Sequence, residues 1–174
     1  SSDNVVYFGS YDGYLYAVTI NRQLVYATYT GHVIRSSPAL TPDGRVFIGS
    51  GNWLLAVKAD GTIDWEYGTE GEVTSSPLYS TDDEVVCVGA QDGVFYCVHD
   101  DGVLDWTYTV GEPLRSSPAP GYGNMVHVAD VTGVLWSFGI GPSVDVGERE
   151  IAGGRLGLMA YPNPSTGRVA LRLA

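Results

Sequence analysis

Basic residues are scarce in this sequence, which holds nine Lys and Arg against 20 Asp and Glu. The net charge of -11 repels phosphate backbones and anionic lipid, so nucleic acid is excluded as an expected partner. Charged residues make up only 17% of the chain and hydrophobic residues 44%, which argues against a disordered chain or a coiled coil. No apolar run reaches the roughly 18 residues that a membrane-spanning helix needs, so no membrane span is expected.

Both ends of the sequence look cut. The chain opens at Ser1 with no initiator Met and no basic-then-apolar leader, and it stops inside an alternating, strand-like run at 169–174. We therefore expect a fragment of a longer protein.

A repeat of about 40 residues is the main signal. Ser-Ser-Pro occurs at 36–38, 75–77 and 116–118, and the equivalent places in successive units are filled by Gly9, Gly49, Gly89 and Ala129. The chain is rich in Gly, at 23 of 174 residues, and it also has 12 Tyr, a mixture typical of strands and turns. Self-similarity at one period indicates a repeat architecture.

Each unit predicts four short antiparallel strands. Asp12-Gly13 and Asp92-Gly93 form hairpin turns, because Gly takes positive φ without steric cost and Asp tolerates the same region. The last strand of the second and third units carries Trp65 and Trp106, and Tyr26 takes that place in the first unit. Four strands per 40 residues is the period of a propeller blade, so we predict an all-β fold with little helix.

The strings Gly-x-x-Asp-Gly-x-Leu-Tyr-Ala-Val and x-Asp-Gly-x-x-x-Trp-x-Tyr, followed by Gly-x-Val-x-Ser-Ser-Pro-Ala, resemble the PQQ-like β-propeller repeat over residues 5–140. The resemblance implies a ring of seven or eight blades in which the Trp-bearing strand docks one blade on the next. Residues 1–140 hold about 3.5 units, so we expect part of a larger ring. Its open sheet edges are expected to associate or aggregate.

The tail carries a second resemblance. Residues 141–157 look like a linker, and 158–174 contain Tyr161, Pro162, Asn163, Pro164 and Gly167 within Tyr-Pro-Asn-Pro-Ser-Thr-Gly. That string resembles the opening of the C-terminal sorting domain of type IX secretion substrates, an immunoglobulin-like sandwich. It implies a first sandwich strand here and export of the parent protein to the cell surface or medium, with the secretion machinery as a partner. An ordinary Pro-rich loop is the alternative.

The two cysteines, Cys87 and Cys97, flank one hairpin. A three-residue turn centred on Asp92 would place them directly opposite each other on one face of the sheet. Outside the cell a cross-strand disulfide would form, and two buried thiols are the alternative. A zinc site would need two further ligands that the sequence does not offer nearby.

No catalytic or metal-binding constellation is expected. Asp12, Asp92 and Asp130 recur at one rim, where calcium is conceivable, but without a dense ligand set they are predicted to be turn formers. The three histidines occupy unmatched places in their units, and no nucleophile motif accompanies them, so no triad is predicted. These histidines are His32, His99 and His127.

Two further features are weighed as contacts for a ligand. Trp53 replaces the usual turn residues of its unit and is either exposed for a sugar or protein contact, or folded back on its own blade. Arg35 and Arg115 each precede a Ser-Ser-Pro, but Thr74 holds that place in the middle unit, which weakens a shared site.

The function predicted is a non-catalytic, secreted or cell-surface propeller that acts as a scaffold or binding module. It would need no cofactor and would bind a protein or carbohydrate on a propeller face. One alternative is a fragment of a PQQ-dependent dehydrogenase, although the adjacent Cys-Cys pair that the resemblance would require is missing. Another alternative is a periplasmic assembly scaffold of the same fold. Fold alone does not decide between them.

Overall fold

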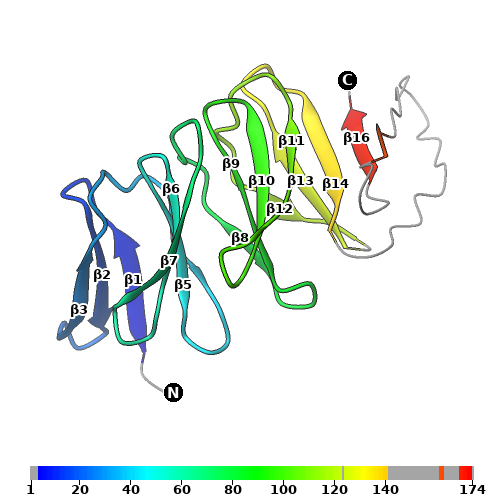
Figure 1. The fold of residues 1–174 in the computed structure, drawn as a ribbon. Coiled ribbons are helices and arrows are strands. Elements are labelled where there is room, and N and C mark those ends of the chain that lie inside the picture. The colour runs from blue at the N-terminus through cyan, green and yellow to red at the C-terminus, as the bar shows by residue number, and fades with distance from the viewer. Residues whose placement is uncertain (1–3, 123, 141–160, 163–168, 174) are drawn as a thin grey trace.

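The computed structural model describes residues 4–122, 124–140, 161–162 and 169–173. These residues form four successive antiparallel sheets that follow one another along the chain, from blue to yellow in Figure 1. The predicted all-β propeller architecture of four-stranded blades is confirmed. The described residues contain no helix long and apolar enough to cross a membrane.

The first three sheets are simple meanders, and the fourth adds β16 and β15 in reversed order. The first holds β1 (Val5–Gly9), β2 (Tyr14–Thr19) and β3 (Leu24–Tyr29). The second holds β4 (Ala39–Leu40), β5 (Val46–Ser50), β6 (Trp53–Val57) and β7 (Ile63–Gly68). The third holds β8 (Leu78–Ser80), β9 (Val85–Gly89), β10 (Val94–His99) and β11 (Leu104–Thr109). The fourth holds β12 (Ala119–Pro120), β13 (Met125–Ala129), β14 (Leu135–Gly139), β16 (Val169–Leu173) and β15 (Tyr161–Pro162).

The described strands of the tail pair with the fourth sheet. β16 pairs antiparallel with β14, at the place that β3, β7 and β11 hold in the other sheets. Its short partner β15 contains Tyr161 and Pro162 of the predicted sorting motif, whereas Asn163, Pro164 and Gly167 lie outside the described residues. The predicted linker, 141–157, lies outside them as well.

The hairpin turns follow the Asp-Gly pairs. Gly13 and Gly93 have φ of 85° and 76°, the left-handed region that a side chain disfavours. In the turns at the other end of the strands, Gly61 and Gly102 have φ of 87° and 90°, in the same region. The turn chemistry read from the sequence therefore forms the hairpins.

The first serine of each Ser-Ser-Pro clamps the strand end beside it. The Ser36 hydroxyl donates to the carbonyl of Gly49 and accepts its N–H, at 3.1 and 2.8 Å. Ser75 repeats this with Gly89, and Ser116 with Ala129. These bonds fix the loops that precede β4, β8 and β12, each to the sheet that the loop leads into.

The second serine links one sheet to the next. The backbone N–H of Ser37 donates to Oγ of Ser76 at 2.9 Å, and that of Ser76 donates to Oγ of Ser117 at 3.0 Å. A ladder of serines therefore crosses from the second sheet to the fourth.

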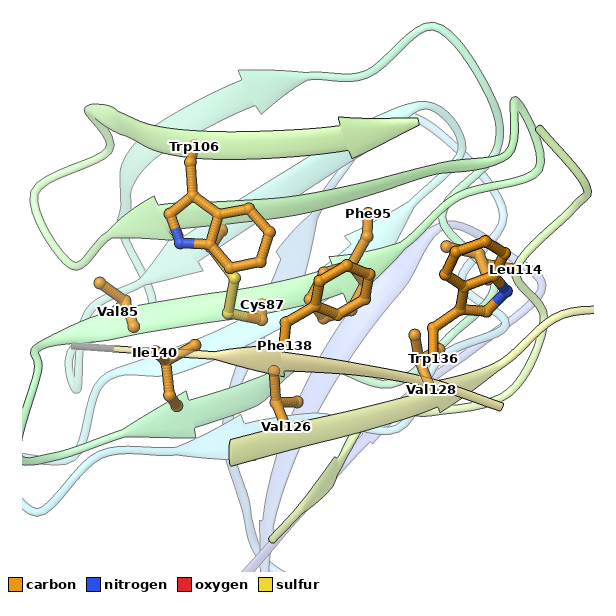
Figure 2. Packing of buried hydrophobic residues seen from close by; sticks show 11 residues of the cluster. Val85, Cys87, Phe95, Trp106, Leu114, Val126, Val128, Trp136, Phe138 and Ile140 are labelled. Carbon is orange, nitrogen blue, oxygen red and sulfur yellow. A yellow bond between two sulfur atoms is a disulfide. The ribbon is translucent and has the colours of Figure 1, made fainter. Parts of the chain in front are cut away.

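The core lies between neighbouring sheets, in three clusters. Figure 2 shows the cluster between the third and fourth sheets, where the rings of Phe95 and Phe138 stack at 4.9 Å. Trp106 packs on both rings.

Aromatic side chains of the last strands also dock each sheet on the next. The indole N–H of Trp65 donates to the carbonyl of Asp100 at 2.8 Å, and its ring covers Gly102 so closely that a Cβ there would lie 2.8 Å from it. Tyr26 covers Gly61 in the same way, at 2.6 Å. The ring therefore fills the space above a glycine in the next sheet.

Candidate functional site

A row of polar side chains crosses from the first sheet to the fourth. The Arg35 guanidinium lies 5.5 Å from the centre of the Tyr11 ring and forms an ion pair with Glu72. Glu72 also accepts a 2.9 Å hydrogen bond from the Gln91 side chain, whose carbonyl oxygen lies 3.4 Å from the Arg115 guanidinium. We call Tyr11, Arg35, Glu72, Gln91 and Arg115 the polar row.

Strand direction places the whole row at one edge of the sheets. Tyr11 and Gln91 follow β1 and β9, and Arg35, Glu72 and Arg115 follow β3, β7 and β11. These strand ends share an edge because neighbouring strands in each sheet are antiparallel. The serine clamps lie directly after the two arginines, so the loops that present them are fixed to the sheets.

The row brings together the two arginines that the sequence singled out. Glu72 and Gln91 connect Arg35 to Arg115, so Thr74 is not needed for a shared surface. Sequence reasoning missed Glu72 and Gln91 because the repeat gives them no special place. No pattern in one sequence would have identified them.

The row is open to solvent and carries both signs of charge. The side chains of Arg35 and Glu72 are 42% and 28% exposed, and Tyr11 is 70% exposed. Contact with Tyr11 and the neighbouring charge of Glu72 raise the pKa of Arg35, which therefore stays a cation. Such a surface offers guanidinium groups and an aromatic ring to a binding partner.

The aspartates at the same edge are engaged within their own hairpins. Asp12 accepts hydrogen bonds from the backbone N–H of Tyr14 and from the hydroxyl of Tyr16, at 3.1 and 2.8 Å. Asp92 makes the equivalent pair of bonds with Val94 and Tyr96.

In the fourth sheet the indole of Trp136 takes the place that the phenol rings of Tyr16 and Tyr96 hold in the first and third sheets. Asp130 accepts from the backbone of Thr132 and Val134 and from the indole N–H of Trp136, at 2.9 Å for the last bond. Among the residues that the structure describes, no three His, Cys, Asp or Glu side chains gather to hold a metal ion.

These hydrogen bonds shift the pKa values of Asp12, Tyr96 and Asp130. Burial opposes the ionisation of Asp130, but the hydrogen bonds from Thr132, Trp136 and the turn backbone outweigh it and lower its pKa. Hydrogen bonds from Ser10 and Tyr16 lower the pKa of Asp12. In the third sheet, burial and the bond to Asp92 raise the pKa of the Tyr96 hydroxyl, so Tyr96 remains a donor.

Cys87 and Cys97 face each other across β9 and β10, in the register that the sequence predicts. Their Cα atoms are 4.2 Å apart, and a disulfide joins them. Both residues are buried in the cluster of Figure 2, at 1% and 0% exposure. The bond is therefore shielded from solvent and from reductants.

Trp53 begins β6 at the edge that carries the polar row, and it is 38% exposed. Its ring lies over Gly68 of the neighbouring strand, where a Cβ would approach it to 3.2 Å. The Trp53 ring is therefore partly folded back on its own sheet and partly exposed to solvent, so both of the alternatives given in the sequence analysis apply in part.

A cleft of about 600 Å³ lies at the opposite edge, between the second and third sheets. Its central cation, Arg45, contacts the Asp100 carboxylate at 3.2 Å and the Asp43 carboxylate at 3.4 Å. Lys58 pairs with Asp64 at 3.0 Å. The contact between Arg45 and Asp100 ties the second sheet to the third, whereas the pairs with Asp43 and Asp64 lie within the unit of the second sheet.

Comparison with known proteins gives a consistent result. A family model described as outer membrane protein assembly factor BamB matches residues 12–170. No curated protein matches the chain.

Two solved structures share the fold. BamB from Moraxella catarrhalis aligns with a TM-score of 0.68 and 17% identity over 80% of this chain and 47% of that chain. The computationally designed Ika8 protein aligns with a TM-score of 0.69 and 20% identity, over 80% of this chain and 44% of that chain. The chain therefore spans less than half the length of either structure.

Proposed function

The chain belongs to the family described as outer membrane protein assembly factor BamB, and from that premise we propose that it is a non-catalytic propeller scaffold that binds a protein partner through the polar row. The propeller fold supports a scaffold or assembly-factor-like role. The observation that carries the proposal is the continuity of the polar row over all four sheets.

The composition of the row favours a protein as the ligand. Arg and Tyr are enriched in protein interfaces, and guanidinium groups bind carboxylates and backbone carbonyls of a partner. Tyr11 is 70% exposed, and it lies beside a fixed cation. A partner that contacts both arginines would span from the second sheet to the fourth. A carbohydrate stacked on Trp53 is the alternative ligand at the same edge.

We propose that the protein works outside the cytoplasm. A disulfide between Cys87 and Cys97 suits an oxidising compartment. The Tyr-Pro-Asn-Pro-Ser-Thr-Gly string supports export to the cell surface or medium, with the secretion machinery as a partner of the tail. A periplasmic assembly factor is the second candidate, and the description of the family favours it.

The proposal is tested by comparing captured partners of three versions of the full-length tagged protein in envelope extracts. Glu72→Lys breaks the centre of the row, and Glu66→Lys makes the same charge change at an exposed position on β7. We expect the wild-type protein and the Glu66 variant to retain the same partner and the Glu72 variant to lose it. Equal capture by all three would refute binding through the row.

The enzyme alternative has its own test. The full-length protein is incubated with pyrroloquinoline quinone, calcium and alcohol or sugar substrates, and dye reduction is followed. We expect no turnover. Sustained reduction of the dye would favour a quinoprotein dehydrogenase over a scaffold.

A further inference from the structure

The turn that joins β5 to β6 departs from the repeat. In the other three units this turn carries an Asp whose carboxylate accepts the backbone N–H two residues further on. The second unit has only Gly51 and Asn52 between its strands, with Gly51 at a φ of 53°, and Trp53 begins the next strand. The second unit therefore replaces the carboxylate of the repeat with an amide and an indole.

Trp53 also has a partner that is particular to its unit. The equivalent positions are Tyr14 in β2 and Val94 in β10, and both of those residues pair with a residue that has a side chain. Trp53 pairs with Gly68, and Cζ3, Cη2 and Cε3 of the indole lie 3.2, 3.5 and 3.7 Å from the position that a Cβ on Gly68 would take. The glycine thus supports the six-membered ring, while Trp53 remains 38% exposed.

The turn that presents Trp53 is fixed to the end of β7. The Asn52 carbonyl accepts the backbone N–H of Thr69 at 2.8 Å and the Thr69 hydroxyl at 2.9 Å. Asn52 itself is exposed, so its side-chain amide offers a donor and an acceptor to solvent beside the indole. Both groups are held by backbone contacts before any ligand arrives, which lowers the entropic cost of binding.

His32 borders the same turn from the loop between β3 and β4. A Cβ on Gly51 would lie 2.8 Å from Cβ and 2.9 Å from Cγ of His32, so the base of the imidazole lies against Gly51. The Ser50 hydroxyl contacts the His32 carbonyl at 3.0 Å and the Thr30 hydroxyl at 2.8 Å. These contacts fix the loop, and His32 is exposed at its surface.

We propose that His32, Asn52 and Trp53, which we call the Trp53 site, bind a neutral glycan through a pyranose ring stacked on the indole. A pyranose with equatorial hydroxyls, as in glucose, presents axial C–H groups on both faces, and such an apolar face suits an aromatic ring. Its hydroxyls then point outward around the ring, where an amide and an imidazole can donate and accept hydrogen bonds. The proposal gives a site to the carbohydrate named above as the alternative ligand, and it does not depend on protein binding by the polar row.

The charge around the site favours an uncharged sugar. The chain carries a net charge of -11, and Glu70, in the loop that follows β7, is exposed. Arg35 lies in the same loop as His32, but its guanidinium is paired with Glu72. An acidic sugar would therefore meet repulsion, whereas a neutral sugar would not.

The test is saturation-transfer NMR on the full chain with two soluble oligosaccharides. Cellohexaose, which consists of β-1,4-linked glucose, is the neutral probe, and hexagalacturonic acid is the anionic comparison. We expect saturation to reach the C–H protons of the glucose rings and not those of the galacturonic acid rings. Equal transfer to both sugars would overturn the proposal. Transfer to neither would also overturn it and leave Trp53 to a protein contact.

Variants assign the binding to the site. Trp53→Leu keeps an apolar side chain over Gly68 but removes the ring, so it should weaken cellohexaose binding at least tenfold while thermal unfolding is retained. Asn52→Ala should weaken it severalfold. Tyr122→Ala is the matched control, because it removes an aromatic ring that is 97% exposed in the loop between β12 and β13, at the opposite edge.

Unchanged binding by Trp53→Leu, or loss of binding in Tyr122→Ala, would overturn the assignment. The titration uses only the purified chain and the sugar, whereas the polar row is tested by capture of a protein from envelope extracts. Failure of one proposal is therefore distinguishable from failure of the other.

Discussion

The phenolic hydroxyl of Tyr96 donates a 2.7 Å hydrogen bond to Oδ2 of Asp92, across the turn that joins β9 to β10. The other oxygen of the same carboxylate accepts the backbone N–H of Val94 at 2.9 Å. One carboxylate therefore closes the turn and anchors an aromatic ring at a sheet interface. The first sheet repeats this arrangement with Asp12 and Tyr16.

Removing the Asp92 carboxylate should destabilise the protein by about 1–3 kcal/mol, because it leaves the Tyr96 hydroxyl without its acceptor. A double-mutant cycle with Tyr96→Phe and denaturant unfolding should show a coupling of about 1 kcal/mol. Asp101→Ala is the matched control, since Asp101 caps a turn at the opposite edge through the backbone of Val103. Equal losses for Asp92→Ala and Asp101→Ala with no coupling would contradict this account.

Acid should destabilise the fold in part through Asp130. Because its pKa is lower in the folded protein than in the unfolded chain, its contribution is fully present above the unfolded value of about 3.9 and is lost as pH falls through the folded value. The free energy of unfolding, measured at pH 7, 4 and 3, should therefore fall less steeply for Asp130→Asn than for the wild type. The same slope in both proteins would show that this carboxyl is not linked to folding.

Gly89→Ala should destabilise the chain by about 1–3 kcal/mol, because the new Cβ would overpack the interface with the fourth sheet. That Cβ would lie 2.6 Å from Cβ of Leu114, a fully buried residue. Ala129→Gly is the reciprocal change at the equivalent place in the fourth unit, and it should cost no more than about 1 kcal/mol. Thermal unfolding of both variants measures the difference, and a neutral Gly89→Ala would show that the sheets can move apart.

Reduction of the bond between Cys87 and Cys97 should lower the free energy of unfolding by about 2–3 kcal/mol, the value expected for a short closed loop. Denaturant unfolding with and without reductant measures this loss. The Cys87→Ala, Cys97→Ala double variant serves as the control, because reductant should not affect it. Two thiols that react in the unfolded but unreduced protein would contradict the disulfide.

Much of the fold could be predicted from the sequence, because repeated turn residues set the strands. Asp92-Gly93 marked a hairpin whose register put Cys87 opposite Cys97, and the structure has that register. The place of β16 could not be predicted, since an alternating run such as 169–174 fits either a separate sandwich or a free sheet edge.

The candidate site was harder to read than the fold. Arg35 and Arg115 stood out by position, but Glu72 and Gln91 join them only through contacts between sheets. Those contacts depend on how successive sheets are stacked, which the repeat period does not encode.

The most direct test of the scaffold account is site-specific photo-crosslinking in living cells that express the full-length protein. A photoreactive residue at Tyr11 probes the polar row, and one at Val103 probes the opposite edge; both positions are well exposed. The account predicts one discrete protein adduct from Tyr11, none from Val103, and loss of the Tyr11 adduct when Glu72→Lys is added. No adduct from Tyr11, or the same adduct from both positions, would contradict a protein-binding role for the row.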